Sequence, residues 1–184
     1  MEKAIYTPKS VVELTAYDSP CGRLILGSYQ GQLCLCDWAT RFYDSEVESR
    51  IGRTLKAKLI EQASEVTQET MRQLEEYFQN ERKTFDLPLM LVGTEFQRRV
   101  WEELNEIPYG ATCSYAELAA SIGRPQSTRA VAHAVGANAI SIIVPCHRIV
   151  GSNGSLTGYA GGLAAKRFLL GIETEQVAFF HPKR

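Results

Sequence analysis

Val144-Pro145-Cys146-His147-Arg148 is the most informative stretch of this 184-residue chain. It follows a short apolar run that begins at Ile140, and it leads into a turn-rich loop. A cysteine beside a histidine and an arginine can be held partly as thiolate, the nucleophilic form of the side chain, because nearby positive charge lowers a thiol pKa. From these local features alone, a reactive cysteine and a buried structural cysteine are equally good interpretations.

His147 is the candidate base for Cys146. Neighbours in an extended segment point to opposite sides, so we expect a bridging water rather than a direct contact between the two side chains. A histidine base is commonly oriented by a third group such as a carboxylate. The residues from Leu118 to Ile172 include no Asp or Glu, so Glu173 is the nearest downstream candidate.

The acid-free stretch predicts a locally basic face. The whole chain has a formal net charge of −1, which by itself indicates nothing about nucleic acid. The stretch carries five basic residues: Arg124, Arg129, Arg148, Lys166 and Arg167. A basic face on a neutral protein is typical of phosphate contact, and chance clustering on a solvated surface is the alternative.

Two short helices are expected upstream of the cysteine. Ser114 and Glu117 have the spacing of a capping box, which predicts a helix ending near Ile122. A glycine-containing turn follows, and Ser127 is the expected cap of a second helix over Thr128–Gly136. This arrangement resembles a helix-turn-helix, although many all-helical cores contain the same pattern.

The first part of the chain is expected to be a small sheet followed by helices. Short strands are predicted at Leu14–Asp18, Arg23–Ser28 and Leu33–Trp38, separated by turn residues. Helices are predicted from Glu46 to Gln62 and from Gln68 to Gln79, the second with apolar residues at core-packing spacing.

An extended linker is expected from Phe85 to Gly93, and it marks the domain boundary. Helices are predicted beyond it at Thr94–Asn105 and Leu163–Gly171. The predicted units are an N-terminal α/β domain, a C-terminal domain and a tail, over residues 1–88, 93–175 and 176–184.

Composition favours a soluble cytoplasmic protein without metal. There is no apolar run of about 18 residues and no signal core, so we expect neither a membrane span nor export. Five cysteines without a disulfide-scaffold spacing indicate reduced thiols. Cys34 and Cys36 could serve as metal ligands or as buried core thiols, and the second interpretation is favoured because no CxxC or HxxxH pattern accompanies them.

The segment from Ile143 to Val150 resembles the active-site signature of the O6-alkylguanine-DNA alkyltransferases, also called methylated-DNA–protein-cysteine methyltransferases. The first 90 residues resemble the family only loosely, at Ser19-Pro20 and Gly22. Further ordered matches between Gly93 and Glu173 are Phe96-Gln97, Val100-Trp101, Ile107-Pro108-Tyr109-Gly110, Ser114-Tyr115, Leu118-Ala119, Arg129-Ala130-Val131, Gly136, Asn138 and Gly158-Tyr159-Ala160-Gly161-Gly162.

The resemblance implies an α+β fold. A small RNase H-like sheet-and-helix domain would precede a mostly helical, winged-helix-like domain that carries the helix-turn-helix and the cysteine. It also implies direct-reversal repair by a cytoplasmic monomer without a cofactor. An alkylated guanine is flipped out of the duplex, and Cys146 takes the alkyl group from O6 irreversibly, so each molecule acts once. O4-alkylthymine is a second candidate substrate.

The resemblance assigns four catalytic residues. Cys146 is the alkyl acceptor, His147 deprotonates it through water, and Glu173 orients His147. Tyr115 matches a tyrosine that crowds the phosphate 3′ of the target and donates a proton to the leaving guanine. An ordinary core or surface tyrosine is the alternative for Tyr115.

The second helix of the motif is the implied DNA-binding element, with Thr128, Arg129 and Ala130 at its start. Arg129 matches the arginine that fills the space of the flipped base, with a simple phosphate contact as the alternative. The helix would lie in the minor groove, which reads little base sequence. Its small apolar residues would either lie against sugars or pack in the core.

Five residues form the implied substrate pocket. Asn138 matches a hinge asparagine that ties the helix-turn-helix to the active-site segment, and a generic turn asparagine is the alternative. Tyr159 and the Ala160 amide would line the pocket and bind O6, and the Ile149 carbonyl would hold the guanine amino group. Val135 stands where some members have a larger side chain, which predicts a roomier pocket.

Two other functions compete with repair. Alkyltransferase-like proteins recognise the same lesion without repairing it, but they have another residue in place of the cysteine that is present here as Cys146. A cysteine hydrolase would need a direct base and an oxyanion hole, and the sequence indicates neither. Some relatives bind zinc through N-terminal histidines, and no histidine precedes His133 here, so no metal is expected.

Overall fold

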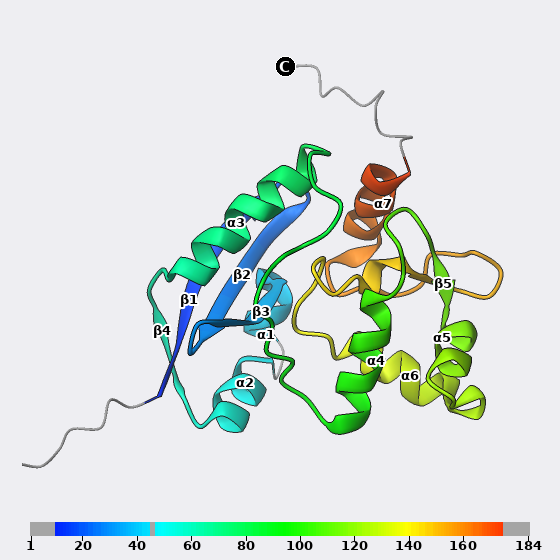
Figure 1. Cartoon of the computed structure of the whole chain (residues 1–184), viewed down its shortest axis with the longest axis horizontal. Coiled ribbons are helices and arrows are strands. Elements are labelled where there is room, and N and C mark those ends of the chain that lie inside the picture. The colour runs from blue at the N-terminus through cyan, green and yellow to red at the C-terminus, as the bar shows by residue number, and fades with distance from the viewer. Residues whose placement is uncertain (1–9, 45–46, 175–184) are drawn as a thin grey trace, which may run out of the picture.

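The N-terminal part of the chain is a four-stranded sheet with helix α3 (Glu65–Phe78) packed along it (Figure 1). The computed structural model describes residues 10–44 and 47–174. Strand order is β3-β2-β1-β4; β1, β2 and β3 pair antiparallel, and β4 joins β1 in parallel. The strands are β1 (Val11–Ser19), β2 (Gly22–Tyr29), β3 (Gln32–Trp38) and β4 (Lys58–Glu61). The three predicted strands are therefore confirmed.

The single helix predicted from Glu46 to Gln62 is wrong. Within this range the chain forms one short helix, α2 (Val47–Leu55), and then strand β4, and a further helix, α1 (Ala39–Asp44), precedes the range. Lys56 has a φ of 49°, a left-handed conformation that ends a right-handed helix. The parallel pairing of β4 with distant β1 then overrides local helix propensity. The predicted start at residue 46 lies outside the described residues.

The C-terminal part is mostly helical. Its helices are α4 (Glu95–Asn105), α5 (Tyr115–Ser121), α6 (Thr128–Gly136) and α7 (Gly162–Glu173), with 3₁₀ turns η1 (Pro125–Ser127) and η2 (Cys146–Arg148). A short parallel pair, β5 (Cys113–Ser114) and β6 (Ile149–Val150), completes it. The predicted α5–turn–α6 pair is confirmed, and so is the capping box at Ser114.

Ser127 precedes α6 but does not cap it through its side chain, contrary to the prediction. The residue has a ψ of 23°, because it belongs to turn η1. A capping side chain needs extended backbone at that position, as at Ser114, whose ψ is 158°. Helix α6 is instead tied to α4, where Trp101 Nε1 donates to the Ala134 carbonyl at 2.7 Å.

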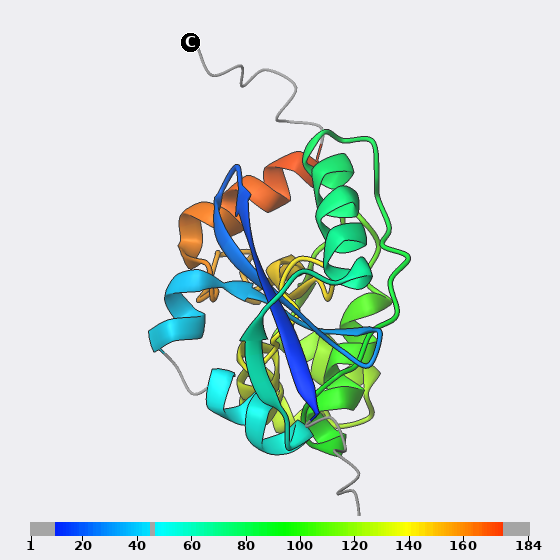
Figure 2. The same cartoon turned by 90° about the vertical axis from the view of Figure 1, so that its left-hand side faces the viewer.

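Strand β3 joins the two parts of the molecule. The segment predicted as a linker lies against it, with hydrogen bonds from Leu33 N to Pro88 O and from Met90 N to Leu33 O. At the other end of β3, Cys36 donates to Ala139 O at 2.8 Å and accepts from Ser141 N at 2.6 Å. In Figure 2 the molecule is rotated by 90°, so that the N-terminal sheet lies at the front. The sheet edge is thus paired with residues that shortly precede Cys146.

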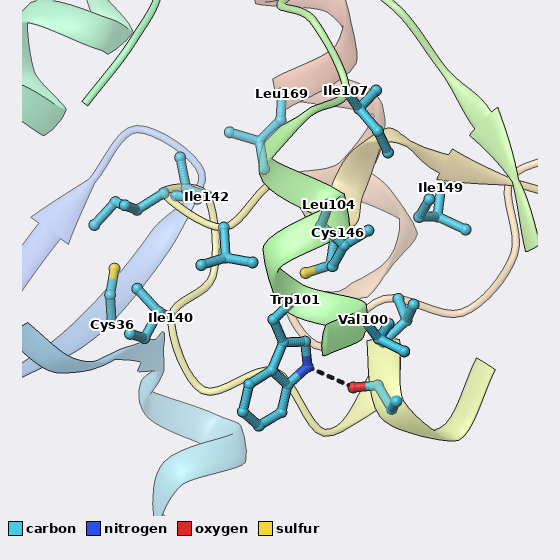
Figure 3. Packing of buried hydrophobic residues seen from close by; sticks show 14 of the residues in the cluster. Cys36, Val100, Trp101, Leu104, Ile107, Ile140, Ile142, Cys146, Ile149 and Leu169 are labelled. Carbon is cyan, nitrogen blue, oxygen red and sulfur yellow. Dashed lines mark hydrogen bonds between the residues drawn. The ribbon is translucent and has the colours of Figure 1, made fainter. Parts of the chain in front are cut away.

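One hydrophobic cluster spans both parts and encloses Cys146 (Figure 3). Cys36 of β3 lies on one side of this cluster and Ile149 on the other. Cys34 and Cys36 are fully buried, which agrees with their interpretation as core thiols. Within residues 10–44 and 47–174, no group of three or more His, Cys, Asp or Glu could hold a metal ion, and no helix could cross a membrane. The predicted tail, 176–184, lies outside the described residues.

Candidate active site

Cys146 begins turn η2 and is 6% exposed. Its Sγ accepts a hydrogen bond from Asn138 Nδ2 at 3.2 Å. Burial raises the pKa of the thiol, while the Asn138 hydrogen bond and the charge of Arg41 act to lower it. The Arg148 guanidinium, which was expected to lower this pKa, is hydrogen-bonded to Glu173. The resting group is therefore a protonated thiol that needs a base.

Asn138 holds the loop that presents Cys146. Its Oδ1 accepts from Ile140 N at 2.9 Å, and its Nδ2 donates to Val144 O at 3.0 Å. Between these bonds, Ile142 is buried with a φ of 71°, a left-handed conformation that costs a β-branched residue about 1–3 kcal/mol. Packing and the Asn138 amide together keep the loop in this conformation.

His147 is joined to Glu173 at the base of the site. The distance from His147 Nε2 to Glu173 Oε1 is 2.8 Å, and both side chains are buried. The segment is a 3₁₀ turn, so the expectation of an extended Cys146–His147 segment is wrong. The predicted partnership of His147 with the first acid after the acid-free stretch matches this geometry.

Glu173 is an ionised carboxylate held by several donors. Arg148 donates from Nε to Oε2 at 2.8 Å and from Nη2 to Oε1 at 3.0 Å. Burial acts to raise the pKa of Glu173, but the hydrogen bonds and charges of His147 and Arg148 lower it to about 2. The guanidinium that was expected to act on Cys146 is therefore committed to this carboxylate.

The ionised state of Glu173 determines which ring nitrogen of His147 carries the proton. Burial lowers the pKa of His147, so the imidazole is neutral at pH 7 although the bond to Glu173 opposes this shift. An ionised carboxylate can only accept, so Nε2 carries the proton and Nδ1 has a free lone pair. Nδ1 is buried and has no hydrogen-bond partner among the described residues. The site thus contains a neutral base beside a protonated thiol.

Gly110 is required by the approach of Glu173. Its φ is +80°, and its amide donates to Glu173 Oε2 at 3.1 Å. A Cβ at this position would lie 2.8 Å from the Glu173 carbonyl oxygen. Both the backbone conformation and the close contact exclude a side chain here.

A cavity of about 300 Å³ opens onto Cys146. Four other residues that were predicted from the resemblance share its wall with the thiol: Tyr115, Val135, Tyr159 and Ala160. The remaining lining residues are Arg41, Ala132, Gly136 and Gly158. The Tyr115 hydroxyl accepts from Thr157 Oγ1 at 3.2 Å, which leaves its own proton free to be donated into the cavity.

Ile149 and Asn138 lie apart from this wall. Ile149 is fully buried in the core, and its carbonyl accepts from the buried ammonium of Lys166. Asn138 contacts Cys146 from behind, as described above. Neither residue is part of the cavity lining, so the structure brings together five of the predicted residues and leaves these two in supporting positions.

Helix α6 lines both the cavity and an open hollow on the outer surface. Arg129 and Ala130 are exposed at its start, and Thr128 is half-buried. An open hollow of about 520 Å³ follows the same helix and is lined by Arg129, Ala132, His133, Gly136 and Ala137. Val131, Ala134 and Val135 are buried. The core-packing interpretation is therefore confirmed for one face of the Ala-rich helix, and the other face is open to the surface.

The predicted basic face is smaller than expected. Lys166 is fully buried and Arg148 is 7% exposed, so neither can contact phosphate at the surface. Charge composition does not indicate burial, and Lys166 is accommodated because its ammonium donates to the Ile149 and Thr157 carbonyls. Arg124, Arg129 and Arg167 remain exposed.

Two residues of the N-terminal part reach the site and were missed. Tyr77 of α3 donates to Glu173 Oε1 at 2.9 Å. Arg41 of α1 donates to the carbonyls of Asn138 and Gly136 at 2.9 and 2.8 Å. The helical spacing around Tyr77 indicated core packing alone, although a buried tyrosine hydroxyl usually needs a partner. For Arg41 the sequence contains no comparable signal.

The fold and site define an α+β protein in which a helix-turn-helix forms one wall of a cavity with a buried thiol. Family models match both parts of the chain: the 6-O-methylguanine DNA methyltransferase ribonuclease-like domain over residues 12–91 and its DNA binding domain over residues 95–175. The chain belongs to the 6-O-methylguanine DNA methyltransferase family.

Individual relatives agree with this assignment. The methylated-DNA–protein-cysteine methyltransferase of Mycolicibacterium paratuberculosis is 44% identical over 163 residues, which cover 89% of this chain and 93% of the relative. The crystal structure of the Mycobacterium tuberculosis O6-methylguanine methyltransferase has a TM-score of 0.75 at 40% identity and covers 92% of this chain and 96% of its own. A crystal structure of the M. tuberculosis protein in complex with DNA has a TM-score of 0.74 at 40% identity, covering 90% and 94%.

Proposed function

We propose that this protein repairs DNA by transferring the alkyl group from O6 of guanine, or from O4 of thymine, irreversibly to its own Cys146. The observation that carries the proposal is the cavity in which Cys146 faces Tyr115 and Tyr159. The His147–Glu173 pair lies behind the thiol. The family assignment and the relatives' names support the same reaction.

The proposed reaction needs no cofactor. A water molecule passes the thiol proton of Cys146 to His147 Nδ1, and the thiolate attacks the alkyl carbon. A C–S bond forms as the C–O6 bond breaks, and the electron pair goes to the guanine. Tyr115 donates its hydroxyl proton to the leaving base and recovers one from solvent. The thioether offers water no good leaving group, so each molecule reacts once.

DNA contact is proposed for helix α6. Arg129 would take the place of the flipped base, with Thr128 and Ala130 beside it on the duplex. The small residues Ala132, which is half-buried, and Gly136, which is exposed, allow close approach to sugars, which supports minor-groove binding with little sequence preference. The contacts that this proposal uses all come from one chain, which supports action as a monomer.

Pocket roles follow from the placements above. Tyr159 and the Ala160 amide would contact the flipped base, and Val135 leaves room beside it. We assign Asn138 a hinge role, because it binds both the loop and the Cys146 sulfur. The Ile149 carbonyl would reach the guanine amino group only if it shared its second lone pair, since it already accepts from Lys166.

The domain division and location are also proposed. We place the boundary between residues 88 and 93, where the chain lacks regular structure apart from an isolated bridge at Leu89. All five cysteines are free thiols, which supports a reducing compartment such as the cytoplasm.

The experiment is a titration of a duplex that carries one O6-methylguanine. Loss of the lesion should rise with added protein and stop at one lesion per molecule. Cys146→Ser should bind the lesion and leave it intact. Sustained turnover would indicate a hydrolytic enzyme instead, and tight binding without lesion loss by the unaltered protein would indicate a recognition protein.

A further inference from the structure

Tyr77 is a buried polar contact between the N-terminal part and the catalytic pair. It lies on α3, 96 residues before Glu173, and its side chain is fully buried. The ring packs among aromatic neighbours, with centroids of Phe78, Phe85 and Tyr109 at 5.4, 5.5 and 6.2 Å. Its hydroxyl leaves this apolar surrounding to reach the Glu173 carboxylate at 2.9 Å.

Tyr77 and His147 share one carboxylate oxygen. Glu173 Oε1 accepts from Tyr77 Oη, from His147 Nε2 and from Arg148 Nη2. Burial and the Glu173 charge raise the pKa of Tyr77 far above its usual range. The phenol therefore keeps its proton around neutral pH, where it is a permanent donor to this oxygen.

A permanent donor on Glu173 Oε1 affects the pKa of the base His147. Each hydrogen bond to a carboxylate oxygen stabilises its negative charge and weakens it as an acceptor for other donors. The Glu173 charge acts to raise the pKa of His147, so a donor that neutralises part of this charge acts in the opposite direction. The same bond also fixes Oε1 against the rigid helix α3.

We propose that Tyr77 is a positioning residue for the alkyl transfer, through which the N-terminal domain holds Glu173 in place and keeps the His147 base neutral. This proposal rests on the proposed function of Cys146 and His147. Purely structural packing of the ring is the competing explanation. Tyr77→Phe separates the two, because it retains the ring and removes only the donor.

Tyr109→Phe is the matched control. Tyr109 belongs to the same aromatic group, and its hydroxyl donates to the Ile172 carbonyl at 3.2 Å rather than to the carboxylate. Both variants lose one hydroxyl near the end of α7. Only Tyr77→Phe changes the donors on Glu173 Oε1.

The first measurement is the single-turnover rate on an O6-methylguanine duplex at saturating protein, as a function of pH. With Tyr77→Phe the rise of the rate with pH should move upward by about 0.5–1 unit. At pH values below the pKa of His147 the rate should therefore fall roughly three- to tenfold, and at pH values above it the rate should change by less than about twofold. A uniform loss at all pH values, or an equal shift in Tyr109→Phe, would overturn the proposal.

The second measurement does not depend on the reaction. ¹⁵N NMR of the imidazole, assigned by comparison with His147→Gln, reports the protonation of His147 directly. The pKa of His147 should rise in Tyr77→Phe and stay unchanged in Tyr109→Phe. If the unaltered protein transfers no alkyl group, the proposed function fails while this titration still tests Tyr77; an unchanged His147 pKa would remove its role.

Discussion

The two parts of the molecule contribute different kinds of groups to one buried centre. The helical part supplies the thiol of Cys146, the base His147 and the carboxylate Glu173. The sheet part supplies donors that hold them: Tyr77 on Glu173, and Arg41 on the carbonyls behind the loop. Of the residues described as lining the cavity, Arg41 alone comes from the sheet part. The reacting groups thus all come from the helical part, whereas the groups that hold them come from both parts.

Glu173→Gln should lower the free energy of unfolding more than the other variants proposed below. The change leaves the buried Arg148 guanidinium without a counter-ion and removes the charge that orients His147. Loss of one partner of a buried pair costs about 3–5 kcal/mol of unfolding free energy, which urea titration measures. Glu102→Gln, at an exposed position of α4, is the control and should leave stability unchanged. Equal stability of Glu173→Gln and the unaltered protein would contradict the assigned role.

Acid should weaken the protein through the same residue. The pKa of Glu173 is about 2 in the fold and about 4.3 in an unfolded chain. Because the folded value is depressed, the stabilisation is present above the unfolded pKa and is lost as pH falls towards 2. A shift of this size corresponds to about 3 kcal/mol. Urea unfolding at neutral and acid pH should show this loss. Glu173→Gln should lose less stability over the same change of pH, because it lacks the titrating carboxyl.

Arg129→Ala tests the outer face of α6. Repair in duplex DNA should fall roughly 10- to 100-fold, because no side chain would fill the space that the flipped base leaves in the duplex. Attack on the free base O6-benzylguanine should change by less than about twofold, because no stack needs filling. Arg124→Ala, at an exposed arginine in the adjoining turn, is the comparison. Equal losses for duplex and free base would remove the wedge role of Arg129.

Arg41→Met sharpens the comparison between holding and reacting groups, and it also removes the pairing of Arg41 with the buried Asp37 carboxylate at 3.5 Å. Arg41 satisfies the Gly136 and Asn138 carbonyls at the C-terminus of α6, a contact worth about 1–2 kcal/mol. Hydrogen exchange at the end of α6 should accelerate, and alkyl transfer should slow, because Arg41 also lines the cavity and its charge acts to lower the pKa of Cys146. Arg23→Met, in an exposed ion pair with Asp18, should leave exchange in α6 unaltered. Unchanged exchange in Arg41→Met would show that the end of α6 does not depend on its contact with Arg41.

Sequence reasoning succeeded where the determining contacts are local. The Ser114–Glu117 capping box predicted the start of α5, because both partners lie within one turn. It failed where the partner is distant: β4 exists through parallel pairing with β1, and Tyr77 meets Glu173 across 96 residues. Lys166 was assigned to the surface, because a charge pattern does not indicate that buried carbonyls will accept from it.

The central claim is that Cys146 is the alkyl acceptor. Its most direct test is the intact mass of the protein after reaction with a duplex that carries one O6-methylguanine, followed by peptide mapping. The account predicts one methyl group in place of one hydrogen, on Cys146 alone, with loss of one lesion for each modified molecule. A methyl group on another cysteine, or lesion loss without any gain in protein mass, would contradict it.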